Sequence, residues 1–82
     1  MDSDKALKLA LKEPLLARVK VTATSIELCS KKTNGLSAVI WTVKIWAKKT
    51  RKPGEDTSVG SVEISATDGR VIKTDLDISR VN

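Results

Sequence analysis

Positive charge in this sequence is concentrated around one tryptophan. Five basic residues fall within nine positions that hold no acidic residue: Lys44, Lys48, Lys49, Arg51 and Lys52. The other ten basic residues balance the ten acidic ones, so the net charge of +5 belongs to this one edge. Such an edge can attract phosphate, anionic lipid or an acidic protein surface. It can also be a solvated hairpin end that keeps the edges of a sheet from aggregating.

Trp46 lies inside this basic segment, between Lys44 and Lys48. An indole beside positive charge offers a surface on which a base of single-stranded nucleic acid could stack. Nucleic-acid or polyanion binding by residues 44–52 is therefore one candidate function, and phosphate contacts would make it strongly salt-dependent. Against it, the charges are few and no second aromatic residue lies among them, so nucleic acid is the less favoured partner.

Residue types that support catalysis are missing from the sequence. Histidine is absent, which removes the usual activator of serine and cysteine nucleophiles and the commonest zinc ligand. The glycines are scattered at positions 35, 54, 60 and 69, so no phosphate-cradling loop is present. Asp75 and Asp77 would share one side of a strand, and we favour solvated carboxylates there over a calcium site. The sequence predicts no enzymatic activity, no cofactor and no metal.

Length and composition predict one globular domain spanning residues 1–82. The chain is 40% hydrophobic and 30% charged, as is usual for a folded domain. Its apolar stretches are shorter than the roughly 20 residues that cross a bilayer, and no basic-then-apolar signal pattern opens it. Cys29 is the only cysteine, so it cannot form an internal disulfide, and we expect a small, buried or half-buried side chain there and no nucleophile.

The N-terminal segment has the pattern of an amphipathic helix. Over residues 3–13, alanine and leucine recur on one side with lysines between them, and all three are strong helix formers. Asp2 or Ser3 can cap the first amides. Pro14 disfavours helical geometry at the residue before it, so the helix should break there, although Pro14 can also open a short turn through Ala17.

Four later segments have the features of β-strands. They cover residues 19–30, 36–49, 62–66 and 70–78, and a polar loop at 50–58 separates the middle two. Asn34-Gly35 and Asp68-Gly69 suit tight hairpin turns. In the last strand the pattern allows either Val71 or the set Ile72, Leu76 and Ile78 to face inward. The sequence predicts an α+β fold in which the N-terminal helix packs on a four-stranded antiparallel meander.

The second strand has two distinct faces. One is apolar and should form the core: Val39, Trp41, Val43, Ile45 and Ala47. The other is mixed: Ile40, Thr42, Lys44, Trp46 and Lys48. We therefore expect Trp41 to be buried and Trp46 to lie on a face that no helix covers, where it either binds a partner or a second copy of the chain, or lies over lysine stems.

The candidate interaction surface combines this open face with the basic edge. It consists of Ile40, Lys44, Trp46, Lys48, Lys49, Arg51 and Lys52. A symmetric homodimer through Trp46 is the simplest self-association, because each copy would present the same patch. A partner could alternatively add a strand to an exposed edge of the sheet.

Three strings, in this order, resemble the PepSY domain family over nearly the whole chain. They are "DKALKLALK", "VIWTVKIWA" and "VEISATDGRVIKTDL". The resemblance implies a two-layer, cystatin-like fold without catalytic residues. It also implies a bacterial, extracytoplasmic module that binds or inhibits a peptidase or contacts an envelope protein. The loop at 48–58 is longer than the usual family hairpin. The favoured function is a non-catalytic, protein- or peptide-binding module.

Overall fold

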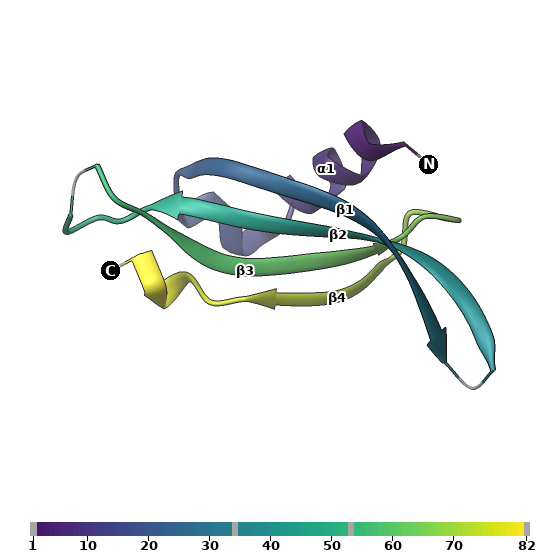
Figure 1. Ribbon diagram of the computed structural model, residues 1–82. Coiled ribbons are helices and arrows are strands. Elements are labelled where there is room, and N and C mark those ends of the chain that lie inside the picture. The colour runs from purple at the N-terminus through teal and green to yellow at the C-terminus, as the bar shows by residue number, and fades with distance from the viewer. Residues whose placement is uncertain (1, 34, 53, 82) are drawn as a thin grey trace.

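A computed structural model describes residues 2–33, 35–52 and 54–81. One α-helix, α1 (Ser3–Leu11), crosses one face of a four-stranded antiparallel sheet (Figure 1). The strands are β1 (Val21–Thr33), β2 (Leu36–Lys48), β3 (Asp56–Ser65) and β4 (Val71–Leu76). Their order in the sheet is their order in the chain. The predicted α+β fold, a helix on an antiparallel meander, is therefore confirmed.

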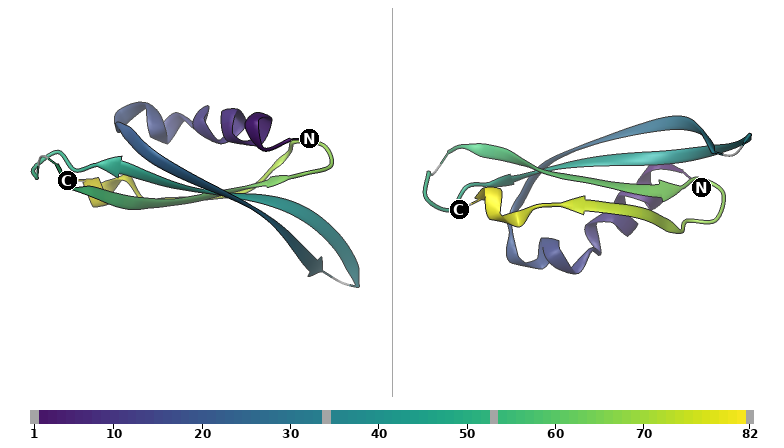
Figure 2. Two further views of the ribbon diagram at one scale, coloured as in Figure 1. Left: turned by 45° about the horizontal axis from the view of Figure 1, so that its top comes forward. Right: turned by 90° about the horizontal axis from the view of Figure 1, so that it is seen from below.

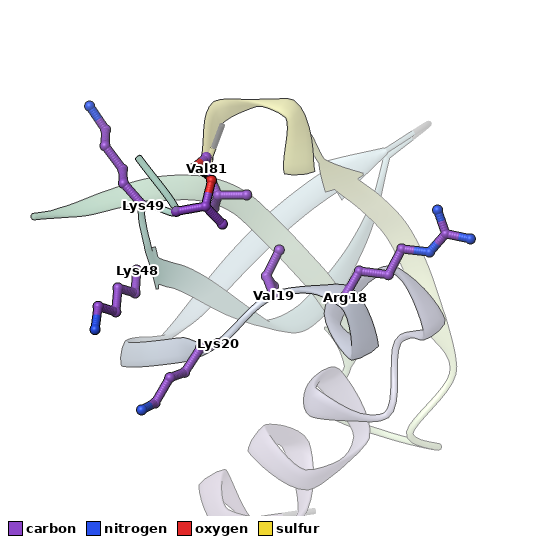
Figure 3. A pocket seen from close by; sticks show the side chains of 7 residues that line it. Arg18, Val19, Lys20, Lys48, Lys49 and Val81 are labelled. Carbon is purple, nitrogen blue, oxygen red and sulfur yellow. Dashed lines mark hydrogen bonds between the residues drawn. The ribbon is translucent and has the colours of Figure 1, made fainter. Parts of the chain in front are cut away.

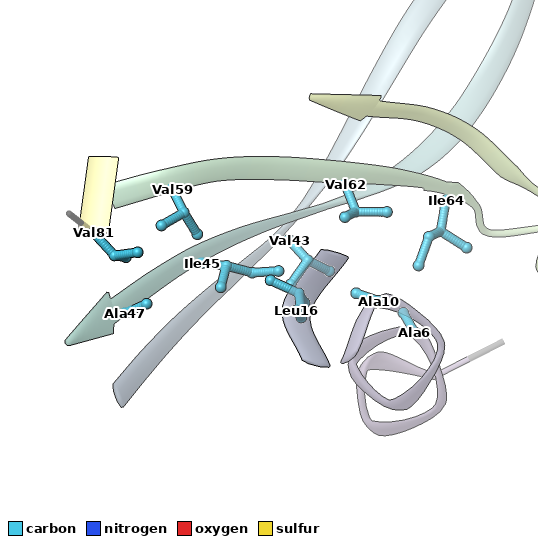
Figure 4. Close-up of a cluster of buried hydrophobic side chains, with 10 residues drawn as sticks. All are labelled: Ala6, Ala10, Leu16, Val43, Ile45, Ala47, Val59, Val62, Ile64 and Val81. Carbon is cyan, nitrogen blue, oxygen red and sulfur yellow. The ribbon is translucent and has the colours of Figure 1, made fainter. Parts of the chain in front are cut away.

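The start of α1 follows the local chemistry of its first residues. Asp2 is the N-cap, and its Oδ1 accepts a hydrogen bond of 2.9 Å from the backbone amide of Lys5. This bond satisfies one of the amides that a helix start leaves without a partner. Ala6 and Ala10 are fully buried, and their small side chains let α1 pack closely on the sheet (Figure 4).

Pro14 ends the helical segment, as predicted. The α-helix stops at Leu11, and Pro14 then opens a 3₁₀ helix, η1 (Pro14–Arg18). A proline suits the first position of a helix, where its missing N–H would have had no partner. Leu16 points from η1 into the core, so this turn closes the end of the molecule that α1 does not reach.

The core lies between the sheet and the two N-terminal helices. Its buried side chains come from every element except β1 and β4: Ala6, Ala10, Leu16, Val43, Ile45, Ala47, Val59, Val62, Ile64 and Val81 (Figure 4). The predicted inward face of β2 is confirmed at its centre. Trp41 packs against this core but is only partly buried, so the expectation that it would be a fully buried anchor was wrong.

The β1–β2 hairpin extends beyond the rest of the sheet. β3 pairs with β2 no further than Ile40, and the two longer strands continue as a twisted ribbon away from α1 (Figure 2). On this ribbon Val39 is 43% exposed and Leu36 is 75% exposed. Val39 therefore lies on the predicted core face but past the end of the core. Gly35 has φ +80, as its hairpin turn requires, and Asn34 lies outside the described residues.

A bulge in β3 brings its backbone close to β4. Ile45 pairs with Gly60, but the next residue of β2, Trp46, pairs with Ser58, so β3 has one extra residue. Gly60 adopts φ +129, and a Cβ placed there would lie 1.9 Å from the carbonyl oxygen of Asp75. Only glycine fits this approach.

The orientation of β4 follows the second predicted alternative only at Leu76. A register shift at Glu63/Ile64 interrupts the alternation of β4, leaving Val71 and Ile72 44% and 48% exposed. Leu76 alone packs against the core. The strand ends there, and Ile78 begins a short 3₁₀ helix that the sequence did not predict, η2 (Ile78–Val81).

Candidate functional site

The residues of the predicted interaction surface do not form one patch. Lys44 and Trp46 alternate with the buried residues Val43, Ile45 and Ala47, so they lie on the face of β2 opposite α1. Ile40 belongs to the same face but is only 5% exposed, so it offers little surface to a partner. Arg51 and Lys52 are exposed in the loop after β2, and Pro53 of this loop lies outside the described residues.

Trp46 is partly buried although no helix covers its face of the sheet. Its register partners are small: Ala23 on β1 and Ser58 on β3. Small neighbours leave space for the indole ring of Trp46 to lie flat against the sheet. Self-association through Trp46 stays a prediction.

Cys29 lies on this same face and is partly buried, as predicted. The Thr42 hydroxyl approaches its Sγ at 4.0 Å.

Lys48 and Lys49, the other two members of the predicted surface, line a hollow at the end of the molecule. Its volume is about 380 Å³, and seven residues surround it: Arg18, Val19, Lys20, Lys48, Lys49, Thr50 and Val81 (Figure 3). These residues come from three parts of the chain: the junction of η1 and β1, the end of β2, and η2. We call this hollow the basic pocket.

Backbone hydrogen bonds hold these three segments together. The amide of Lys48 donates to the carbonyl oxygen of Lys20 at 2.9 Å. Thr50 donates twice to the carbonyl oxygen of Val81, from its amide at 2.7 Å and from its hydroxyl at 3.1 Å. Hydrogen bonds that involve the main chain therefore hold the walls of the basic pocket together.

The basic pocket has apolar walls and a positively charged rim. Val19 and Val81 lie at the middle of the hollow, while Lys20 and Lys48 extend together to one side (Figure 3). Lys49 is 3.7 Å from the carboxylate of Glu55. Within residues 2–33, 35–52 and 54–81, the other three cations of the rim have no acidic group within ion-pairing distance. The rim therefore carries an excess of positive charge.

Arg18 and Lys20 were not among the predicted site residues. They lie in the sequence far from the basic segment, and only the antiparallel pairing of β1 with β2 brings them beside Lys48. A signal for this was present, because a hairpin centred on residues 34 and 35 places residue 20 opposite the end of the second strand.

Asp77 stabilises the start of η2, the turn that places Val81 at the wall of the basic pocket. Its Oδ1 accepts hydrogen bonds from the hydroxyl and from the backbone amide of Ser79. These two bonds favour the charged carboxylate and lower the pKa of Asp77 below its ordinary value of 3.8. The neighbouring guanidinium of Arg80 adds a smaller effect in the same direction.

We expect the charge of Asp77 to control the order of η2. Because folding lowers this pKa, the contribution of Asp77 to stability is complete above pH 3.8 and is lost as the pH falls through the folded-state pKa. Carboxyl-carbon NMR should give a midpoint below 3.8 for Asp77, and Ser79→Ala should raise it. A midpoint at the ordinary value, unchanged in Ser79→Ala, would contradict this assignment.

Comparison with protein-family models, curated proteins and solved structures finds no match to this chain. The resemblance to PepSY domains, and the peptidase or envelope partner that it implies, therefore stay predictions. Within the described ranges, no helix is long and apolar enough to span a bilayer.

Proposed function

We propose that this protein is a non-catalytic module that binds an extended protein or peptide segment as a fifth strand along β1. The observation that carries this proposal is the length and openness of that strand. β1 has 13 residues, it ends the strand order, and its one neighbour is β2. Among the described residues, no other element hydrogen-bonds to the backbone of residues 21–33.

Over residues 21–30, β1 lacks the usual protection of an edge strand, whereas Lys31 and Lys32 follow at its hairpin end. Natural edges are blocked by short length, proline, bulges or charged side chains, lysine above all. Residues 21–30 contain no proline and a single charged residue, Glu27, and the one bulge lies at the start of the strand. Unpaired amides and carbonyls of such a strand can pair with an incoming chain.

The opposite edge of the sheet differs in each respect. β4 has only six residues, and Lys73 and Asp75 are charged. The amide of Asp77 still pairs with β3, donating to the carbonyl oxygen of Val59 at 2.7 Å, and η2 then ends this edge. This contrast favours β1 as the binding edge.

Side chains beside β1 would select the bound segment. Ile26 and Leu28 lie on the α1 side of the strand, and Leu28 is 57% exposed. An added strand would place alternate residues next to these two, so we expect it to carry apolar residues at every second position. A peptidase or an envelope protein, the partner class implied by the PepSY resemblance, could supply such a segment.

A library of extended peptides displayed on phage tests this proposal. Selected peptides should show alternating apolar residues, and binding should slow hydrogen exchange of the outward-facing amides of β1. Thr24→Lys should weaken binding about tenfold or more, because it places a charge in the new interface. Thr74→Lys on β4 is the matched control and should leave affinity unchanged. Protection on β4 instead, or equal loss in both variants, would reject strand addition at β1.

A further inference from the structure

We propose that the basic pocket binds a phosphate monoester that carries a short apolar group. This inference does not depend on strand addition at β1. It rests on three properties of the basic pocket that are independent of one another: its charge, its walls and its size.

The charge of the rim favours an anion with two negative charges. Four cationic residues line the hollow, Arg18, Lys20, Lys48 and Lys49, and two of them, Lys20 and Lys48, extend to the same side (Figure 3). Among the residues that the structure describes, no acidic residue lines the hollow, although Lys49 is paired with Glu55 and Lys48 lies opposite Asp56 in the β2–β3 register. Lys20 and Lys48 have no ion-pair partner among the described residues, so an anion with two charges gains more from both of them than a carboxylate with one charge can.

The side chains of the rim suit phosphate oxygens in two ways. The lysine ammonium groups are compact charges with three donors each, and Lys20 and Lys48 extend to the same side of the hollow (Figure 3). The guanidinium of Arg18 can donate two parallel hydrogen bonds to one phosphate. Because Arg18 extends to the other side of the hollow, a phosphate at the rim would draw mainly on the ammonium groups of Lys20 and Lys48 (Figure 3).

The apolar walls of the basic pocket are the reason to expect an apolar group on the ligand. Val19 and Val81 face the hollow, and hydrogen bonds from Thr50 hold Val81 in place. A volume of about 380 Å³ lies near the lower end of the roughly 300 to 1,000 Å³ of small-molecule sites. It admits a phosphate with a short alkyl group on the valines, and it is too small for a long acyl chain.

Butyl phosphate is the probe that tests this site. NMR titration should show saturable shifts of the Val19 and Val81 methyl groups, and n-butanol should shift neither. Butyrate, with one charge, should bind about tenfold more weakly. Lys20→Gln and Lys48→Gln should each weaken binding of butyl phosphate about tenfold, as expected for loss of one charged hydrogen bond.

Lys52→Gln is the matched control, because it removes the same charge from an exposed loop position that does not line the basic pocket. It should leave binding of butyl phosphate nearly unchanged. Equal weakening in Lys52→Gln and Lys48→Gln, or no shift of the valine methyl groups, would overturn the proposal. Thr24→Lys should retain this binding, which separates the basic pocket from the β1 edge.

Vesicles that contain phosphatidic acid distinguish the two sources of such a phosphate. Binding to both vesicles and butyl phosphate, with the same loss in Lys48→Gln, would identify a lipid headgroup as a ligand of this site. Binding to butyl phosphate alone would identify a soluble phosphate monoester. Binding to vesicles alone would overturn the proposal, because the basic pocket would then not recognise the phosphate monoester itself.

Discussion

Replacing Gly60 with alanine should lower the free energy of unfolding by about 3 kcal/mol or more, since strain and overpacking act at the same position. The methyl group would lie 1.9 Å from the backbone oxygen of Asp75 and 3.0 Å from the Cα of Leu76. Both are main-chain atoms, so no side-chain rotation can relieve the clash. The positive φ of +129 adds strain for any residue with a Cβ. To accept alanine, β4 would have to move away from β3.

The control for this prediction is Gly54→Ala. Gly54 also has a positive φ, +88, but a Cβ there meets no atom within 4 Å. Gly54→Ala should lower the free energy of unfolding by about 1 kcal/mol, which is the strain of the backbone conformation alone. Urea unfolding of both variants measures the difference. Equal losses of unfolding free energy in the two variants would show that β4 can move away from the β3 bulge at little cost. Because a domain of this size has a total stability of about 5 to 10 kcal/mol, Gly60→Ala should unfold well below the wild-type midpoint.

Ile45→Ala should destabilise the protein by about 3 to 4 kcal/mol, within the range for large-to-small substitutions in a core. Ile45 is fully buried in the C-terminal half of β2, among the largest side chains of the core. The neighbouring side chains belong to strands and helices with fixed backbones, so they can fill only part of the space that the isoleucine leaves. The expected loss is therefore the transfer energy of three carbon atoms together with the cost of a cavity.

Ile72→Ala is the matched control for Ile45→Ala. The same atoms are removed from β4, but Ile72 is 48% exposed, so the loss should stay under about 1 kcal/mol. Thermal or urea unfolding of the two variants compares them directly. Similar losses would mean that the core is centred elsewhere. Trp41→Ala should cost less than Ile45→Ala despite the larger side chain, since Trp41 is only partly buried.

Local sequence patterns were enough to predict most of the fold. The alternation along residues 39–47 identified the inward face of β2, and the glycine of each hairpin turn marked where the chain reverses. Pro14 marked the end of the α-helix because its effect on the preceding residue is local. Such features depend on a few neighbouring residues, and for that reason the sequence alone reveals them.

The register shifts could not be predicted in the same way. A bulge adds one residue to a strand, and everything beyond it changes face. The shift at Glu63/Ile64 left Val71 and Ile72 both exposed, although strict alternation would have buried one of them. Gly60 was visible as a glycine, but its close approach to β4 depends on a strand that follows later in the chain.

The basic pocket was predicted only in part. Lys48 and Lys49 were found from the local density of charge, which is a property of the sequence. Arg18 and Lys20 join them through strand pairing and through the 3₁₀ turn after Pro14, which are properties of the fold. The apolar wall formed by Val81 depends on η2, for which no sequence pattern was recognised.

The meander order of the strands has a consequence for synthesis on the ribosome. Each strand pairs with the next one along the chain, so the β1–β2 hairpin can close as soon as its two strands have emerged. The helix α1 emerges first but packs against β2 and β3, and the residues of β3 that cover it are made much later. Its apolar side therefore stays exposed during most of translation. Nascent chains that stop before Val59 should leave α1 open to chaperones, and addition of β3 should close it.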